Sequence, residues 1–361
     1  MLKKIGISIA VILVLVGVFV GPKIAVFIAG QTKTVNKVTK DFYYNSLDGF
    51  EGLSEQLFNQ GILEDKADFI KVGEYKNLDN STLASGRYRI EPGTNFRTLL
   101  NGFTKNSAGN GNAEVEVDVA FNNCRDIYQL AGKVSKMIMV DSSTLVSEVL
   151  KPSMLARLNL TIETVPALFL PNTYRMFYDV SPEAFIERME ANYTAFWNDT
   201  RLAKLKKLNF KRRDQVVTLA SIVYSEQAKN KAEWPVIAGL YLNRLDEGMK
   251  LQSDPTFKFC WGDKLEGVQR LLAVHRKINC PYNTYLVKGL PPGPINLPSS
   301  AVIEAVLNAP KVKYLFMCAK PDYSGRHNFA VSGAEHLRNA KVFQDWLGSE
   351  QKKKKRKAHG S

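Results

Sequence analysis

The chain has 361 residues, of which 45% are hydrophobic and 23% charged, and this composition excludes a largely disordered chain and suits two folded domains. Lys and Arg total 49 against 35 Asp and Glu, which gives a formal net charge of +14. So basic a chain suits nucleic acid, an anionic membrane surface or another polyanion as a partner, and the charge alone does not choose among them.

The first element is an apolar segment. Residues 5 to 20, IGISIAVILVLVGVFV, contain no charged side chain, and apolar residues resume at 24 to 29 as IAVFIA. A helix that crosses a bilayer needs about 17 to 25 apolar residues, and the segment reaches this length if Lys23 extends its charge to the lipid headgroups. We therefore expect residues 1 to 30 to hold a short cytoplasmic start and a transmembrane helix.

A cleaved signal peptide is the alternative, because a short basic start precedes the apolar run. No small-x-small cleavage site follows residues 5 to 20, which favours an uncleaved anchor. Lys3 and Lys4 favour a cytoplasmic N-terminus. With one span, we expect a single-pass protein of the cell (inner) membrane, whose chain after residue 30 is extracytoplasmic or periplasmic.

Residues 41 to 105 predict a small α/β unit. The stretch 53 to 63, LSEQLFNQGIL, has helical periodicity. Residues 84 to 103 indicate a turn, a short strand, a Pro-Gly turn and a helix, with Thr94 as its expected N-cap. The Gly- and Asn-rich stretch 105 to 114, KNSAGNGNAE, is typical of a linker.

The remainder predicts a larger mixed domain, so the fold class expected for the chain is α+β. Residues 114 to 121, EVEVDVAF, alternate strictly and predict a strand. Helices are expected to dominate from 126 to 245. After residue 250, turns alternate with short apolar runs, of which 313 to 319, KYLFMCA, predicts a buried strand. The basic run KKKKRK is typical of a disordered tail, expected over 349 to 361.

One helix carries a carboxylate at the end of an apolar stripe. Residues 219 to 228 read LASIVYSEQA, and helical spacing places Glu226 on one face with Val216, Leu219 and Val223. Burial at such an edge disfavours the charged form and raises the pKa of a carboxyl group, as a general acid near neutral pH requires. The alternative is a glutamate at a fraying helix end, turned to water or paired with a nearby lysine.

Cysteines and histidines give no metal signal. The four histidines are scattered, and the four cysteines form neither a CxxC nor another metal-binding spacing. We expect no metal and no other cofactor. A disulfide between Cys260 and Cys280, the nearest pair in sequence, is possible in an oxidising compartment, but we favour four buried free cysteines: Cys124, Cys260, Cys280 and Cys318.

Four stretches carry a resemblance to a known family: LASIVYSEQ at 219–227, YLNRLDEGMKLQSDPT at 241–256, YNTYLVKGLPPGPINLPS at 282–299 and GRHNFAVSGAEH at 325–336. Their order and spacing, with the single anchor, resemble the endolytic murein transglycosylases, the MltG or YceG-like family. The resemblance covers nearly the whole chain after the anchor. It implies a LysM-like domain with its linker over 31 to 112, a YceG-like catalytic domain over 113 to 348, and Glu226 as the catalytic residue.

The chain departs from the family pattern at two places. The family often has a second glutamate two positions before the catalytic one, where this chain has Tyr224. An acidic stretch of the family is here PNTY at 171–174, with Asn172 in the acidic place, and Pro166-Ala167 stands where Glu-Gly is usual. These departures leave Glu226 intact but put an auxiliary role for those carboxylates in doubt.

The resemblance implies a lytic transglycosylase, a lyase that manages with one carboxylate where most glycosidases use two. Glu226 would protonate the oxygen between N-acetylmuramic acid (MurNAc) and N-acetylglucosamine (GlcNAc), then take the proton of the 6-hydroxyl that closes onto C1. The product would be a 1,6-anhydro end. The residues that motif match makes candidates for lining the glycan cleft are Asn243, Arg244, Gln252, Asp254, Tyr282, Asn283, Tyr285 and His327.

Each of these candidates has a structural alternative. Asn243 and Asp254 could cap or anchor turns, and His327 could be a structural histidine. Arg244 could pair either with the carboxylates of the substrate or with nearby Asp246.

The expected partners are peptidoglycan glycan strands and, by resemblance alone, peptidoglycan synthases. The main alternative function is a non-enzymatic scaffold that binds peptidoglycan and recruits synthesis or division proteins. A nucleic-acid partner is disfavoured, because Lys and Arg cluster only weakly, at 204 to 213, and because the anchor places the domain outside the cytoplasm.

Overall fold

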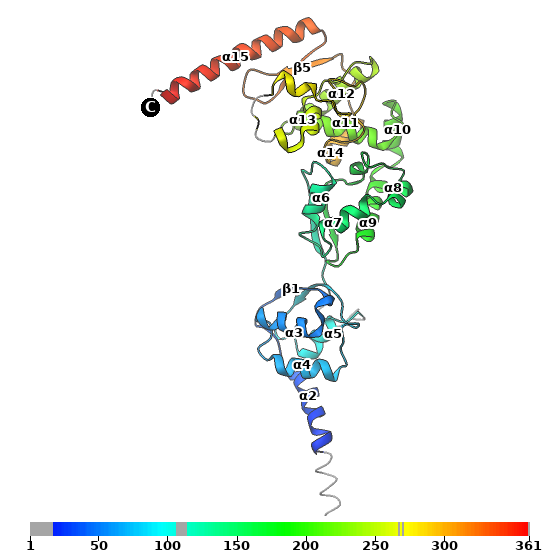
Figure 1. Cartoon of the computed structure of the whole chain (residues 1–361), viewed down its shortest axis with the longest axis vertical. Coiled ribbons are helices and arrows are strands. Elements are labelled where there is room, and N and C mark those ends of the chain that lie inside the picture. Colours follow the sequence, from blue (N-terminus) through cyan, green and yellow to red (C-terminus); the bar gives the residue numbers. More distant parts are fainter. Residues whose placement is uncertain (1–16, 106–113, 266–267, 269–270, 360–361) are drawn as a thin grey trace, which may run out of the picture. The chain divides into compact units, whose positions relative to one another are not determined.

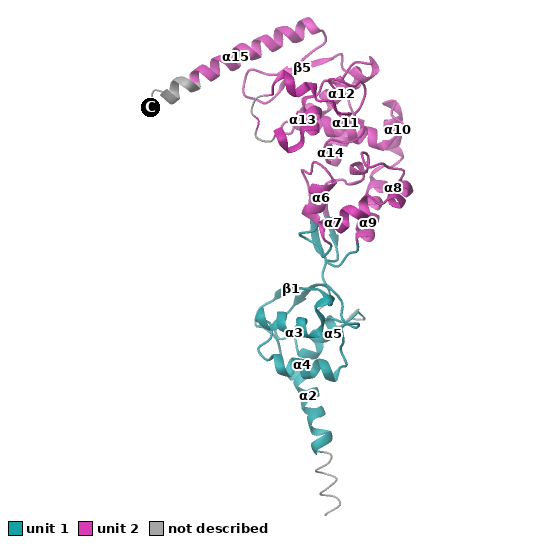
Figure 2. Cartoon of the chain, in the orientation of Figure 1, with its two compact units in different colours: residues 1–119, 135–140, 174–181 teal, residues 120–134, 141–173, 182–361 magenta. Residues whose placement is uncertain are grey.

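The computed structural model describes residues 17–105, 114–265, 268 and 271–359. The chain divides into two compact units (Figure 2). The first comprises residues 1–119, 135–140 and 174–181, and the second comprises 120–134, 141–173 and 182–361.

The first unit begins with α2 (Gly21–Thr32), which has a proline in its first turn, where the missing N–H costs no helical hydrogen bond. Residues 1–16, the larger part of the expected anchor, lie outside the described residues. Of the helices in the described ranges, none is long and apolar enough to cross a membrane.

A two-stranded antiparallel sheet and three further helices complete the small α/β unit. Strand β1 (Lys40–Tyr44) pairs with β2 (Gly86–Ile90), with Phe42 opposite Tyr88. The helices are α3 (Gly49–Asn59), α4 (Lys66–Tyr75) and α5 (Phe96–Gly102). Aromatic side chains fill the core between them, including Phe42, Tyr88 and Phe103, none more than 1% exposed. The expected α/β character is confirmed, whereas the LysM-like identity stays a prediction.

The N-cap of α5 differs from the expectation by one residue. The side chain of Asn95, and not that of Thr94, accepts a hydrogen bond from the backbone N–H of Thr98. Thr94 instead donates to the carbonyl of Glu91 in the preceding turn. Most of the expected linker, residues 106–113, lies outside the described residues.

The expected strand at 114–121 is present as β3 (Val117–Phe121), which alternates buried and exposed residues and pairs with β4 (Asn172–Met176). The helices expected in the larger domain are also present. Those that precede the site are α6 (Ile127–Val134), α7 (Ser142–Val149), α8 (Pro152–Leu158), the 3₁₀ turn η2 (Val165–Leu168), α9 (Pro182–Phe196) and α10 (Asp199–Lys207).

Helix α11 (Arg213–Glu226) is the central element of the second unit. It packs against α12 (Trp234–Asp246), α13 (Asp254–Trp261) and α14 (Ser300–Leu307), which surround it in Figure 1. Residues 216–223 are all buried, as expected for a helix that is covered on every side. The apolar stripe that the sequence predicts therefore lies in the buried middle of the helix, whose last three residues are partly or fully exposed.

Strands β5 (Phe316–Ala319) and β6 (His327–Ala330) form an antiparallel ribbon against which α15 (Gly333–His359) packs. The expected strand at 313–319 is shorter and only half-buried, because this ribbon has two strands and one of its faces borders a pocket. The tail expected to be disordered from residue 349 instead continues α15 to His359. Lys, Arg, Glu and Gln, which dominate it, are good helix formers.

The preference for four free cysteines is wrong. Cys260, in α13, and Cys280 form a disulfide with their Cα atoms 6.2 Å apart. Cys124 is buried and Cys318 half-buried, and both are free thiols. The segment that the disulfide closes contains the 3₁₀ turns η4 (Gly262–Leu265) and η5 (Ala273–Lys277).

Candidate active site

Glu226 is the last residue of α11 and is half-buried at the floor of a pocket of about 440 Å³. Its Oε1 atom accepts a hydrogen bond from the hydroxyl of Tyr241, at 2.8 Å, and a second from the hydroxyl of Ser253. Within the described residues, neither Lys229 nor Lys231, which follow in the sequence, is paired with it. The carboxyl group is thus directed into the protein and held there by two donors.

Burial raises the pKa of Glu226 above its ordinary value. The hydrogen bonds from Ser253 and Tyr241 act against this, because they stabilise the ionised form, and so does the charge of His327. The negative charge of Asp254 adds to the effect of burial, and the net direction is upward. The carboxyl group therefore keeps its proton to a higher pH than a glutamate in water.

Helix α12 supplies Tyr241, whose ring is only 2% exposed. The helix starts immediately beside the end of α11, because the indole N–H of Trp234 donates to the carbonyl of Gln227 at 2.6 Å. At Gly239 a Cβ atom would lie 2.8 Å from the carbonyl oxygen of Pro310, so only glycine permits this close approach.

The turn before α13 supplies Ser253. Gln252 has a φ of 53°, in the left-handed region that residues other than glycine rarely adopt. The backbone N–H of Gln252 and that of Ser253 donate to the carbonyl and the hydroxyl of Thr284, at 3.1 and 3.0 Å. This turn points the Ser253 hydroxyl at Glu226 and leaves the Gln252 side chain at the pocket.

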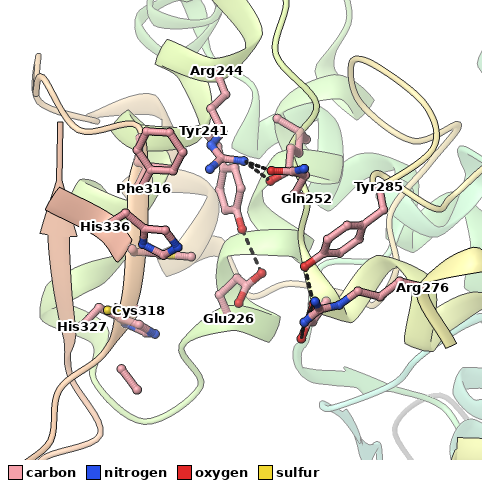
Figure 3. A pocket seen from close by; sticks show the side chains of 15 residues that line it. Glu226, Tyr241, Arg244, Gln252, Arg276, Tyr285, Phe316, Cys318, His327 and His336 are labelled. Atoms are coloured by element: carbon pink, nitrogen blue, oxygen red, sulfur yellow. Dashed lines mark hydrogen bonds and ion pairs between the residues drawn. The ribbon is translucent and has the colours of Figure 1, made fainter. Parts of the chain in front are cut away.

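One wall of the pocket carries a charged cluster. The hydroxyl of Tyr285 donates to Asp254 at 2.6 Å, and Nη2 of Arg276 lies 3.2 Å from the same carboxylate. The Arg276 guanidinium also lies over the Tyr285 ring, 4.9 Å from its centroid. In Figure 3 Tyr285 and Arg276 lie on the opposite side of Glu226 from Phe316 and Cys318 of β5.

The other wall is formed by the β5–β6 ribbon and α15, with Phe316, Cys318, His327 and His336 (Figure 3). Glu233, the last residue of the 3₁₀ turn η3 (Lys231–Glu233), accepts from the backbone N–H of His327 at 3.0 Å and lies 2.9 Å from Nδ1 of its ring. The carboxylate of Glu233 thus fixes the orientation of the imidazole.

Glu233 also accepts a hydrogen bond from the side chain of Gln227 at 2.9 Å. Gln227 directly follows Glu226, so this bond ties the end of α11 to the ribbon. In the described part of the chain, no three His, Cys, Asp or Glu side chains are grouped to hold a metal ion. The expectation that no cofactor is needed stays a prediction.

A sequence model of the YceG-like family matches residues 44–342, which is most of the chain. The chain belongs to the YceG-like family. The 2.6 Å crystal structure of a yceG-like protein from Listeria monocytogenes has a similar fold, with a TM-score of 0.55 and 22% sequence identity over 84% of this chain and 99% of that one. At this identity the likeness shows the fold alone.

Curated relatives from two species carry the name endolytic murein transglycosylase. The protein of Bacillus subtilis is 35% identical over 158 residues, which cover 44% of this chain and 42% of that protein. The protein of Streptococcus pneumoniae is 30% identical over 175 residues, covering 47% of this chain and 30% of that protein. The matched part thus spans less than half the length of each relative.

Within this family fold, six of the nine site residues expected from the sequence line one pocket: Glu226, Arg244, Gln252, Asp254, Tyr285 and His327. Arg244, however, is only 6% exposed and donates to the carbonyl oxygens of Lys250, Leu251 and Leu315. No ion pair joins it to Asp246 within the described ranges. The guanidinium of Arg244 is therefore hydrogen-bonded to backbone carbonyls. Arg244 fixes the backbone around the pocket and is too buried to bind a substrate carboxylate directly.

The other three expected residues are not among those that line the pocket. The side-chain amide of Asn243 donates to the carbonyls of Val312 and Tyr314, at 2.8 and 2.9 Å. Asn283 is fully buried and donates to the carbonyls of Arg276 and Ile278.

Tyr282 packs against the ring of Phe259 at 4.7 Å, and burial raises the pKa of its hydroxyl to about 12. All three expected substrate contacts therefore serve to fix the loops around the pocket in the free protein.

Sequence reasoning missed several residues of the pocket. Tyr241 and Ser253 stand inside the quoted motifs, but an aromatic residue in a helix and a serine before a helix are usually structural. Arg276, Phe316 and Cys318 lie outside all four motifs, and no periodicity marked them. Only the three-dimensional structure brings them to the same cavity.

The two departures from the family pattern lie away from the carboxyl group of Glu226. The hydroxyl of Tyr224 donates to the side chain of Asn123 at 2.7 Å. Asn172 is the exposed first residue of β4, where its side-chain oxygen accepts from the backbone N–H of Thr173. Neither residue is among those lining the pocket.

Proposed function

We propose that the chain is an endolytic lytic transglycosylase, which cleaves the MurNAc–GlcNAc bond within peptidoglycan glycan strands and leaves 1,6-anhydroMurNAc ends. The observation that carries the proposal is Glu226, a half-buried carboxyl group with a raised pKa and two hydroxyl donors at the floor of a pocket. The names of the two curated relatives support the same reaction.

In the first step, protonated Glu226 donates its proton to the glycosidic oxygen as the bond to C1 of MurNAc breaks. The sugar ring passes through an oxocarbenium-like state, which its own acetamido oxygen can stabilise by bonding to C1. The hydroxyls of Tyr241 and Ser253 already donate to Oε1, so they stabilise the carboxylate that this step creates.

In the second step, the 6-hydroxyl oxygen of the same MurNAc residue bonds to C1, and the bond between C1 and the acetamido oxygen breaks. The Glu226 carboxylate takes the proton that the 6-hydroxyl gives up. The carboxyl group regains its proton, and no water is consumed. One group that acts first as acid and then as base works best with a pKa near the ambient pH. The balance of burial against two hydroxyl donors fits this requirement.

A second carboxylate, Asp254, also lines the pocket, and most glycosidases use two. Here the hydroxyl of Tyr285 donates to Asp254 and the guanidinium of Arg276 pairs with it, so the carboxylate of Asp254 is already engaged by two side chains of the pocket wall. We infer that Asp254 orients these side chains and that Glu226 alone transfers protons.

We further propose that residues 1 to 30 anchor the chain in the cell membrane, with the catalytic unit on the outer face where glycan strands are made. The uncharged run at 5–20 supports this placement, whereas in the apolar run at 24–29 Val26 and Ala29 pack against the core of the first unit. A catalytic unit so placed would meet peptidoglycan synthases, which are the proposed protein partners.

The test uses the full chain in mild detergent, uncrosslinked glycan strands and mass spectrometry of the products. The parent is expected to release internal fragments that end in 1,6-anhydroMurNAc, and Glu226→Gln is expected to release none. Glu187→Gln, at an exposed position of α9, is the matched control and should behave as the parent. Reducing ends would show hydrolysis instead, and binding without cleavage would favour the scaffold.

A further inference from the structure

Two arginines line the pocket, and only one of them has an exposed guanidinium. Arg244 is 6% exposed and its guanidinium is surrounded by backbone carbonyl oxygens. The side chain of Arg276 is 45% exposed. An anionic group that enters the pocket therefore finds Arg276 as the accessible guanidinium.

The Arg276 guanidinium is oriented by its neighbours. Asp254 binds it through Nη2, and the Tyr285 ring supports its flat face. In the part of the chain that the structure describes, Asp254 is the one acceptor that it contacts. An arginine has five N–H donors in a planar fork, so the donors on Nε and Nη1 remain for a planar anion such as a carboxylate.

The backbone that carries Arg276 is also held in place. Its carbonyl accepts a hydrogen bond from the side chain of Asn283 at 2.9 Å. The indole of Trp261 donates to the carbonyl of the preceding residue, His275, at 2.9 Å. The disulfide then joins α13 to the end of this segment at Cys280. Holding the cation in advance reduces the entropy lost when a ligand binds.

We propose that Arg276 binds a carboxylate of the muramyl residue, either on its lactyl ether or on its stem peptide. The inference rests on the proposed function and extends it to the choice of bond. MurNAc differs from GlcNAc only by the lactyl group, so an uncharged site would fit both sugars of the alternating strand. A carboxylate bound at Arg276 sets the register in which C1 of MurNAc, and not C1 of GlcNAc, faces Glu226.

The experiment measures binding in the absence of cleavage, with the full chain carrying Glu226→Gln and with Arg276→Met added. Three strand preparations are compared: strands with stem peptides, strands stripped to free lactyl carboxylates, and stripped strands whose carboxylates are converted to neutral methylamides. Isothermal titration calorimetry gives Kd for each. Arg157→Met is the matched control, since Arg157 is also half-exposed (50%) and paired with a carboxylate, but does not line the pocket.

Arg276→Met is expected to weaken binding about fivefold to tenfold, the effect of losing one partly exposed charge-assisted contact. The loss should occur on strands that carry the recognised carboxylate and be absent on methylamide strands. Loss on stripped strands alone identifies the lactyl group, and loss on stem-bearing strands alone identifies the peptide. Arg276→Lys keeps the positive charge but not the planar guanidinium, so it should weaken binding less than Arg276→Met does.

Equal Kd values for the Glu226→Gln chain with and without Arg276→Met, on both charged preparations, would overturn the role of Arg276 and leave the proposed function standing. If the Glu226→Gln chain binds none of the three preparations, both the role of Arg276 and the proposed function are overturned. Thermal unfolding of each variant, followed by circular dichroism, shows whether a changed Kd belongs to a folded protein. A loss of binding that extends equally to methylamide strands would show a structural effect and would also refute the inference.

Discussion

Replacing Tyr241 with phenylalanine removes one of the two hydroxyl groups that donate to Glu226, here over 2.8 Å, and leaves the buried ring in place. This bond stabilises the ionised carboxylate, so its loss raises the pKa of Glu226 further. A hydrogen bond to a charged group contributes about 1.5–3 kcal/mol. At about 1.4 kcal/mol per pH unit, the pH at which the general acid loses its proton moves upward by roughly one to two units.

The measurement is kcat/KM for the release of 1,6-anhydro ends between pH 4 and pH 10. Activity that needs a protonated acid falls as the pH rises through the pKa of Glu226, so the alkaline limb should move to higher pH in Tyr241→Phe. Tyr224→Phe is the control, because its hydroxyl binds Asn123 and not Glu226. An alkaline limb that stays in place, or moves to lower pH, would refute the assignment of Tyr241.

Three further outcomes follow from the geometry. Glu226→Gln should raise the Tm at neutral pH relative to the parent. The reason is that burial raises the pKa of Glu226 in the native state above its ordinary value of 4.5. The folded parent therefore holds a proton that the unfolded chain has released, and its stability falls as the pH rises above that value. The difference in Tm between the two proteins should grow from pH 4 to pH 7 in calorimetric scans, and a constant difference would contradict it. Arg244→Met should destabilise the protein by about 3 kcal/mol in urea unfolding, because buried carbonyl oxygens lose their donors; a change under 1 kcal/mol would show that water replaces the guanidinium. The double change of Cys260 and Cys280 to serine opens a segment of 20 residues and should cost about 3 kcal/mol. The same loss should appear when the parent is reduced, and equal stability of the oxidised and reduced parent would contradict it.

The position of Glu226 could be predicted because it depends on local periodicity. Val216, Leu219 and Val223 recur at helical spacing, and a helix with that stripe places the next carboxylate beside the core. The helix indeed ends at Glu226, which makes the residue half-buried and not fully enclosed. The alternative of a frayed end open to water is wrong, because two hydroxyls from other elements fix the carboxyl group.

The partners of that carboxyl group could not be predicted, because they come from separate elements. Tyr241 follows Glu226 by 15 residues and Ser253 by 27. In the sequence, Tyr241 is one more apolar position of α12, and Ser253 is the residue before a helix. Only the packing of α12 and α13 on α11 directs both hydroxyls to one oxygen atom.

Membership of a motif also does not distinguish a residue whose side chain faces a cavity from one whose side chain holds the surrounding backbone in place. Asn243 and Arg244 are adjacent in the same motif, and both use their donors on backbone carbonyls. A polar side chain inside a fold must satisfy its hydrogen bonds, and the nearest acceptors are usually backbone groups. Arg276, outside every motif, keeps free donors because its segment lies at the rim of the pocket.

The position of the acid at the end of α11 has a consequence for its proton affinity. The C-terminal end of a helix carries partial negative charge from its last carbonyl groups, which disfavours a carboxylate there. This effect has the same sign as burial, whereas Tyr241 and Ser253 oppose both. The pKa of Glu226 is therefore raised by burial and by its place at the end of α11, and lowered by the hydroxyls of Tyr241 and Ser253. Substitutions at Tyr241 or Ser253 should shift the pH optimum while leaving the helix, and the position of the acid, unchanged.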